Sequence, residues 1–149
     1  MSSAAAAART AGLTVAPAAA DSAVRSFLAF DYGTRRVGVA LGNSLLRRAQ
    51  PLKTVAAEGP ARFAAIEALL REWQPDALVV GVPFHPDGAA HDNTLRARRF
   101  ARQLHGRFGL PVNEVDERYS TVEALAQGAV DVDAASAAVI LDQFLQGLP

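Results

Sequence analysis

A short run of apolar residues, Ala77–Val82, constrains the fold of this chain more than any other feature of its sequence. A strand with one face in water alternates between apolar and polar residues, whereas a strand covered on both faces is apolar throughout. Pro75 before the run and Pro83 after it are expected to limit its length. The run therefore predicts a central strand in a sheet that is covered on both faces.

Four other segments have the pattern of strands and complete the predicted sheet. Two of them form a hairpin across the turn Tyr32-Gly33-Thr34, a third follows Pro51 close to an edge, and the last precedes an acidic pair. These strands are Phe27–Asp31, Val37–Leu41, Leu52–Val55 and Val112–Val115.

Helices are predicted between and after the strands. The first opens at Pro60, and its core-facing side is expected to consist of Phe63, Ile66, Leu69, Leu70 and Trp73. The second covers residues 95–108 after a loop over 83–93. The last begins at Asp133, and the capping pattern at 120–123 indicates a short helix before it. A hairpin followed by strand–helix units predicts an α/β fold with a mixed five-stranded sheet flanked by helices.

The length and composition of the chain favour one soluble domain. Residues 1–26 are rich in Ala and Ser and nearly lack large apolar side chains, so we expect a disordered tail there. Residues 27–149 then form a single domain, and no stretch is long and apolar enough to span a membrane. The absence of cysteine excludes disulfides, thiolate zinc sites and a cysteine nucleophile, and it fits a cytoplasmic location.

The charge balance limits how this chain can bind a polyanion. Lys and Arg number 15, as do Asp and Glu, so the formal net charge is zero. No global electric field is available to attract nucleic acid, and any such binding must depend on a local basic patch.

Acidic residues end two separate predicted strands and begin the last helix. Asp31 ends the first strand, Asp116-Glu117 follows the strand over 112–115, and Asp133 starts a helix that can pack across the strand ends. Functional residues of open α/β sheets gather beyond the strand ends. Converging carboxylates repel each other unless a divalent cation lies between them, and oxygen ligands suit Mg²⁺ or Mn²⁺. Such ions can activate water for attack on a phosphodiester.

Each acid also has an interpretation that involves no catalysis. Asp31 can shape the turn at Tyr32-Gly33, and Asp133 can cap its helix. Asp116 or Glu117 can pair with Arg118 at the surface. Because Asp116 and Glu117 are adjacent in an extended segment, only one of them is expected to reach the site. Asp131 is expected to be a solvated loop residue.

Four motifs, in order, resemble the YqgF (RuvX) family of Holliday-junction-resolvase-like proteins. They are Phe30-Asp31-Tyr32-Gly33-Thr34-Arg35-Arg36-Val37-Gly38-Val39-Ala40, Val79-Val80-Gly81-Val82-Pro83 with Asp87-Gly88, Asp116-Glu117-Arg118-Tyr119-Ser120-Thr121-Val122-Glu123-Ala124, and Val132-Asp133-Ala134-Ala135-Ser136-Ala137. The resemblance implies an RNase H-like fold and a nuclease that matures the 5′ end of pre-16S ribosomal RNA in ribosome biogenesis. It also implies that the metal-binding and catalytic acids are Asp31, Asp116, Glu117 and Asp133.

Basic residues near these motifs are candidates for contacts with phosphates. The alternative is that the arginines of the second helix form a solvated face, and that Arg118 neutralises Glu117. Arg47 and Arg48 are expected to border the site. His85 or His91 can act as a proton shuttle, or both can be passive loop residues. The candidate nucleic-acid-binding residues are Arg35, Arg36, Arg96, Arg98, Arg99, Arg102 and Arg118.

Four functions remain open at this point. The first is a metal-dependent nuclease, monomeric or homodimeric, whose partner is precursor ribosomal RNA. The second is a resolvase of branched DNA, which would need two sites and therefore a dimer. The third is an RNA-binding factor in ribosome assembly without catalysis. The fourth is a phosphate-binding module like one lobe of the actin-like ATPases, although 149 residues supply a single lobe.

Overall fold

The computed structural model describes residues 23–84, 89–117 and 131–149 of the chain. Its strands are β1 (Ser26–Tyr32), β2 (Val37–Asn43), β3 (Ala49–Val55), β4 (Ala77–Val82) and β5 (Val112–Asp116). Its helices are α3 (Gly59–Trp73), α4 (Asp92–Phe108) and α6 (Val132–Gln146). The short helix predicted at 120–123 lies outside the described residues.

The strands form one mixed five-stranded sheet in the order β3-β2-β1-β4-β5, as predicted. β1 pairs with β2 and β2 with β3 in the antiparallel direction, while β1, β4 and β5 run parallel. The carboxyl ends of these three parallel strands therefore meet at one edge of the sheet.

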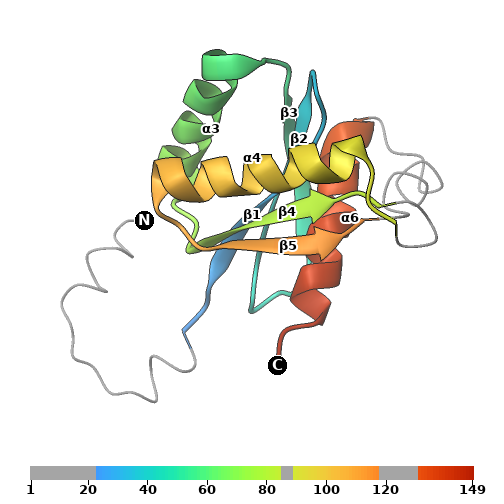
Figure 1. The fold of residues 1–149 in the computed structure, drawn as a ribbon. Coiled ribbons are helices and arrows are strands. Elements are labelled where there is room, and N and C mark those ends of the chain that lie inside the picture. The colour runs from blue at the N-terminus through green and yellow to red at the C-terminus, as the bar shows by residue number, and fades with distance from the viewer. Residues whose placement is uncertain (1–22, 85–88, 118–130) are drawn as a thin grey trace.

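Helices cover both faces of the sheet (Figure 1). α3 and α4 lie over one face, where Leu28 and Phe30 of β1 pack with Phe100 and Leu104. α6 covers the other face, where Phe27 and Ala29 of β1 belong to a second core cluster. All residues of β4 are buried, which confirms the prediction from its unbroken apolar run.

Some details of the elements differ from the sequence prediction. β3 begins at Ala49, so Pro51 lies inside a strand, where it is tolerated because β3 is at the sheet edge. α4 begins at Asp92, three residues early, because the His91 side chain accepts a hydrogen bond from Asn93 N–H and caps the helix. The prediction that Trp73 packs in the core is wrong: the side chain is 37% exposed, in the last turn of α3.

No helix in the described part of the chain has the length and apolarity needed to cross a membrane.

Candidate active site

Asp31 lies between two glycines at the carboxyl end of β1. In the sheet, its neighbour on β2 is Gly38 and its neighbour on β4 is Gly81. Because side chains alternate along a strand, Asp31 points to the same face as Phe27 and Ala29, which is the face covered by α6. The two glycines leave the space on either side of the Asp31 carboxyl group to other parts of the chain.

The space above Gly81 is filled by the side chains of Glu117 and Ile140. A Cβ atom on residue 81 would collide with Glu117 Oε2 and with Ile140 Cδ1. Glu117 directly follows β5, and its N–H donates to Val82 O at 3.1 Å, so the strand pairing is continued to this residue. The Gly81 position is therefore filled by protein side chains and does not leave open space at the strand end.

The first turn of α6 packs against the backbone of β2 at Gly38. A Cβ atom there would collide with the carbonyl oxygen of Asp133 and would lie 2.9 Å from Ala134 N. Only glycine allows this close approach. The contact fixes the start of α6, and with it Asp133, beside the end of β1.

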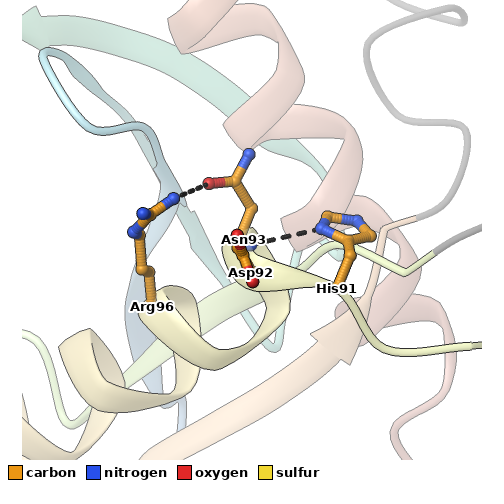
Figure 2. A pocket seen from close by; sticks show the side chains of 4 residues that line it. All are labelled: His91, Asp92, Asn93 and Arg96. Atoms are coloured by element: carbon orange, nitrogen blue, oxygen red, sulfur yellow. Dashed lines mark hydrogen bonds between the residues drawn. The ribbon is translucent and has the colours of Figure 1, made fainter.

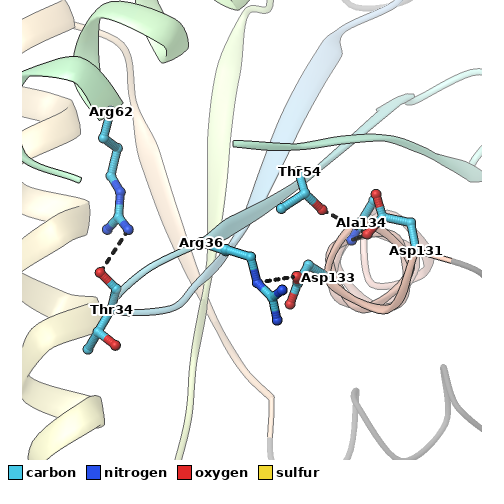
Figure 3. A network of polar contacts seen from close by, with 7 residues as sticks. All are labelled: Thr34, Arg36, Thr54, Arg62, Asp131, Asp133 and Ala134. Carbon is cyan, nitrogen blue, oxygen red and sulfur yellow. Dashed lines mark hydrogen bonds and ion pairs between the residues drawn. The ribbon is translucent and has the colours of Figure 1, made fainter. Parts of the chain in front are cut away.

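Asp131, and not Asp133, caps α6 (Figure 3). The Asp131 carboxylate accepts hydrogen bonds from Ala134 N–H at 3.0 Å and from Thr54 Oγ1 of β3 at 2.7 Å. Two expectations are corrected by this arrangement: Asp131 is not simply a solvated loop residue, and Asp133 is not the cap. The Asp133 side chain is consequently available for other contacts.

Asp133 forms an ion pair with Arg36 of the β1–β2 turn. Arg36 Nε lies 3.1 Å from Asp133 Oδ2, and both side chains are partly exposed (Figure 3). The negative charge of Asp133 also acts on Asp31 and raises its pKa. Asp133 is therefore close enough to the end of β1 to interact electrostatically with its carboxyl group.

Asp31 and Glu117 share a hydrogen bond between their carboxyl groups. Burial is the main cause of a pKa of about 6 for Asp31; the hydrogen bond with Glu117 lowers it and the charge of Asp133 raises it. Burial also raises the pKa of Glu117 to about 10, with further contributions from the charge of Asp31, this hydrogen bond and the charge of Asp116. Two buried carboxyl groups in contact cannot both ionise without a counter-charge, so the pair holds a proton at neutral pH.

Only one residue of the pair Asp116 and Glu117 contacts Asp31. Glu117 turns toward the α6 face, whereas Asp116, the last residue of β5, is exposed and acts on Glu117 through its charge. The alternation of neighbouring residues predicted that one of the two would reach the site, and it did not say which one. The predicted partner Arg118 lies outside the described residues.

The carboxylate oxygens at this strand end are the type of ligand that a hard divalent cation prefers, but within the described residues they are not gathered into a complete metal site. Glu117 Oε2 is buried and has no hydrogen-bond partner among the described residues, and a buried oxygen left in this way normally has a ligand or an ion to satisfy it. Asp31 and Asp133 supply further carboxylate oxygens. In the described residues no group of three or more acidic or histidine side chains is arranged so that it could hold a metal ion, and Asp133 is instead paired with Arg36.

The four predicted arginines of α4 lie on two different sides of the helix. Arg96 and Arg99 line a hollow next to α3, whereas Arg102 lines a hollow next to β5. Arg98 is paired with Glu114 of β5, with Nε 3.4 Å from Oε1. The cluster predicted from the sequence is therefore divided.

Arg47 does not border the acids, contrary to expectation. Its Nη1 and Nη2 donate to Leu148 O and Pro149 O at 2.9 and 2.8 Å, beyond the carboxyl end of α6. Asp133 lies at the opposite end of that helix. Arg35 is exposed in the β1–β2 turn next to Arg36, and Arg48 is exposed at the start of β3.

His91 is built into the start of α4. Its Nδ1 accepts from Asn93 N–H at 3.2 Å, and Arg96 donates to Asn93 Oδ1 at 3.2 Å (Figure 2). Together with Asp92, these residues line a hollow of about 520 Å³ that is lined by none of the four candidate acids. The structure favours the structural interpretation of His91, whereas His85 lies outside the described residues.

Two parts of this region were missed by the sequence analysis. Thr54 supports the cap of α6, and no local pattern on an edge strand indicates that. Arg62 is buried beneath the β1–β2 turn, and its position was detectable: it precedes Ile66 by four residues and Leu69 by seven, so it lies on the apolar side of α3.

The fold and the carboxylates at the strand ends define a protein of the RNase H-like class. A solved structure of T. thermophilus RuvC in complex with a Holliday junction substrate has the same fold, with a TM-score of 0.50 and 17% identity over 81% of this chain and 93% of that one. At this identity the likeness concerns the fold alone.

The sequence itself is similar to a family model over residues 25–147, described as "RuvX: Holliday junction resolvase". The chain belongs to the RuvX family, as the four motifs predicted. A relative from Albidiferax ferrireducens is 68% identical over 84% of this chain and 80% of its own length. A relative from Paraburkholderia phytofirmans is 57% identical over 83% of this chain and 89% of its own length. Both are named "Putative pre-16S rRNA nuclease".

Proposed function

We propose that this chain is a metal-dependent nuclease that hydrolyses a phosphodiester bond in precursor ribosomal RNA. The observation that carries the proposal is the contact between the largely desolvated carboxyl groups of Asp31 and Glu117, with the charge of Asp133 close by. Such a concentration of desolvated acids is unfavourable by itself and is typical of sites that bind hard cations.

Asp31, Glu117 and Asp133 would hold the ion, Mg²⁺ or Mn²⁺, and Asp116 would add negative charge beside them. When bound, the metal would supply an activated water and stabilise the leaving oxygen. The side chains themselves have distinct tasks. Glu117 and Asp31 concentrate negative charge at the strand ends, and the packing of Ile140 over Gly81 excludes water from one side. Arg36 can neutralise Asp133 or contact a substrate phosphate.

Pre-16S rRNA is proposed as the substrate because both of these relatives carry it in their names; cleavage at its 5′ end is the prediction from the family resemblance. We place the protein in the cytoplasm, where such precursors are processed in ribosome biogenesis. Arg35, Arg36, Arg96 and Arg99 are the proposed phosphate contacts; Arg98, Arg102 and Arg118 remain predictions from the sequence.

The decisive experiment is a cleavage assay on precursor 16S rRNA with Mg²⁺ or Mn²⁺ varied. We expect Asp31→Asn and Glu117→Gln each to lower the rate at least about 100-fold, because loss of even an outer-shell partner of a metal ligand costs about 10–100-fold. Glu72→Gln, an exposed substitution on α3, is the matched control and should cut like the wild type. Wild-type cleavage in EDTA, or an Asp31→Asn variant of normal activity, would show that the proposal is wrong.

A resolvase of branched DNA is the second candidate, because the family model carries that description. It requires a dimer, since two symmetric cuts need two sites. Faster cutting of a DNA four-way junction than of precursor RNA, by a protein that sediments as a dimer, would favour it. A non-catalytic assembly factor would instead bind precursor RNA equally well with and without metal.

A further inference from the structure

Arg62 is a buried cation, and no buried anion accompanies it in the part of the chain that the structure describes. The residue is 5% exposed, on the side of α3 that faces the sheet. Its Nε donates to Ala57 O at 2.8 Å and its Nη2 to Thr34 O at 3.0 Å, and its guanidinium lies 5.5 Å from the centre of the Tyr32 ring. A guanidinium carries five N–H donors, so these two bonds leave part of its capacity unused.

No carboxylate among the described residues forms an ion pair with Arg62. Burying a charge is costly unless an opposite charge accompanies it. The neighbouring carbonyl oxygens and the ring face compensate the guanidinium only partly. An anion from outside the chain would complete this environment.

A hollow of about 300 Å³ lies in front of this guanidinium, between α3, α4 and the end of β1. Its charged residues are Arg62, Arg96, Arg99 and Glu58, three cations against one anion. Tyr32, Thr34 and Gln103 add hydroxyl and amide groups. The hollow is therefore positively charged and rich in hydrogen-bond donors, which is the chemistry that recognises a phosphate group.

We propose that this hollow binds a phosphate group of the nucleic-acid backbone, next to the phosphate that is cut. The proposal rests on the nuclease function above and extends it to a second contact site. Tyr32 directly follows Asp31 in β1, and neighbouring side chains of a strand point to opposite faces. The hollow and the acids thus lie on opposite faces of one strand end, so a strand of nucleic acid that crosses this end can contact both.

The β1–β2 turn links the two places. Arg62 holds the carbonyl group of Thr34 in this turn, and two residues later Arg36 contacts Asp133 (Figure 3). A phosphate bound at Arg62 would therefore lie next to the segment that also carries Arg36. The subsite would fix the position of the substrate relative to the acids.

The test is the affinity of the full chain for a short fluorescent single-stranded RNA, measured by anisotropy in EDTA at several salt concentrations. We expect Arg62→Gln and Arg99→Gln each to weaken binding about tenfold and to reduce the slope of log K against log salt by about 0.7, the value for one lost phosphate contact. Arg71→Gln, an exposed substitution on α3 that removes the same charge, is the matched control and should bind like the wild type.

An equal loss of affinity in Arg71→Gln and Arg99→Gln would overturn the proposal, because general electrostatic attraction would then explain the binding. Unchanged binding in Arg99→Gln would overturn it as well. If Arg62→Gln does not fold, as its melting curve would show, Arg99→Gln alone decides.

A second experiment shows whether the hollow binds RNA or free phosphate. It also separates failure of the subsite proposal from failure of the nuclease proposal. Inorganic phosphate is titrated into the protein and followed by NMR; if it binds at the hollow while RNA binding ignores Arg99→Gln, the hollow takes a free anion and the nucleic-acid proposal is wrong. The same proteins are assayed for cleavage with Mg²⁺. If the wild type cuts RNA and neither Arg62→Gln nor Arg99→Gln changes binding or cleavage, only the subsite proposal is wrong. If RNA binding depends on Arg99 but no protein cuts RNA, only the nuclease proposal is wrong.

Discussion

The carboxyl group of Glu117 lies in the space that a side chain on residue 81 would fill. This mutual arrangement explains a glycine in a strand whose other residues are larger, although glycine weakens a strand interior. The position of Glu117, a candidate metal ligand, therefore depends on Gly81, which has no side chain that could take part in the reaction.

Gly81→Ala should therefore both destabilise the fold and reduce cleavage. The added methyl group would push against Glu117 and Ile140, and overpacking of this kind costs about 1–3 kcal/mol. Urea unfolding measures the loss. Gly106→Ala is the control, because a Cβ there meets no atom within 4 Å and alanine in helix α4 should add about 0.5–1 kcal/mol. Equal effects of the two substitutions would contradict this account.

The hydrogen-bonded carboxyl groups of Asp31 and Glu117 make the stability of the metal-free protein depend on pH. The pKa of Asp31 rises from 3.8 to about 6 and that of Glu117 from 4.5 to about 10, so the folded state binds more protons than the unfolded state between these values. The contribution of these two groups to the free energy of unfolding is then greatest below about pH 4. It falls as the pH rises through about 6, where Asp31 ionises, and continues to fall toward 10, where Glu117 does.

Thermal melting in EDTA tests this expectation between pH 5 and pH 9. The melting temperature should fall across this range in the wild type and fall less in Glu117→Gln, which keeps the shape of the side chain without its charge. Addition of Mg²⁺ should restore stability at high pH, because a bound cation favours the ionised carboxylates. A wild-type melting temperature that rises with pH would contradict the assigned environment.

At the scale of elements, α6 decides where Asp133 lies. The helix is fixed at its start by the contact at Gly38 and by the cap at Asp131, which reaches Thr54 on β3. The sequence offered Asp133 as the cap and Asp131 as a solvated loop residue, whereas Asp131 is the cap in the structure. The choice between them depends on a tertiary contact with an edge strand, which no local pattern contains.

Asp131→Ala should cost about 1 kcal/mol of unfolding free energy, the usual value of an N-terminal cap. It should also reduce cleavage, because the first turn of α6 carries Asp133. Asp131→Asn keeps an acceptor oxygen and is the matched control, with stability and activity close to wild type. Urea unfolding and the precursor RNA assay measure the two effects, and a loss of stability as large in Asp131→Asn as in Asp131→Ala would exclude the capping role.

The strands were predictable for reasons that lie in the elements themselves. An apolar run such as Ala77–Val82 fits a strand covered on both faces, and the alternation in β1 matches its two core clusters. The contact between Asp31 and Glu117 was only partly predictable. The convergence of strand ends followed from the parallel order, whereas the glycines that admit Glu117 and α6 became meaningful only when the neighbouring elements were in place. Trp73 shows the same limit, since helical spacing predicts a face but not where the core ends along the helix.

At the scale of the whole molecule, the formal net charge of zero means that affinity for nucleic acid has to come from local patches. The arginines of α4 lie on two sides of the helix, and only Arg96 and Arg99 join Arg62 around the positive hollow. Near the start of the described residues, Arg25 N–H donates to Ser44 Oγ at 2.9 Å, and Ser26 N–H donates to Asp76 Oδ2 at 2.8 Å.

Removal of residues 1–22 should therefore leave the melting temperature and the cleavage rate unchanged. Removal of residues 1–26 is the matched comparison and should lower the melting temperature, because it deletes the hydrogen bonds of Arg25 and Ser26 and the first residue of β1. Differential scanning fluorimetry compares the two. A large loss of stability in the shorter truncation would show that the segment before Ala23 contributes to the fold.

The contact of Arg47 with the backbone oxygens of Leu148 and Pro149 has a practical consequence for anyone who labels or immobilises this molecule. A fluorophore, affinity tag or surface linker attached after Pro149 would strain these two hydrogen bonds, which hold the carboxyl end of α6. The same helix carries Asp133 at its other end. A probe attached before Ala23 does not alter the two residues whose backbone oxygens Arg47 contacts.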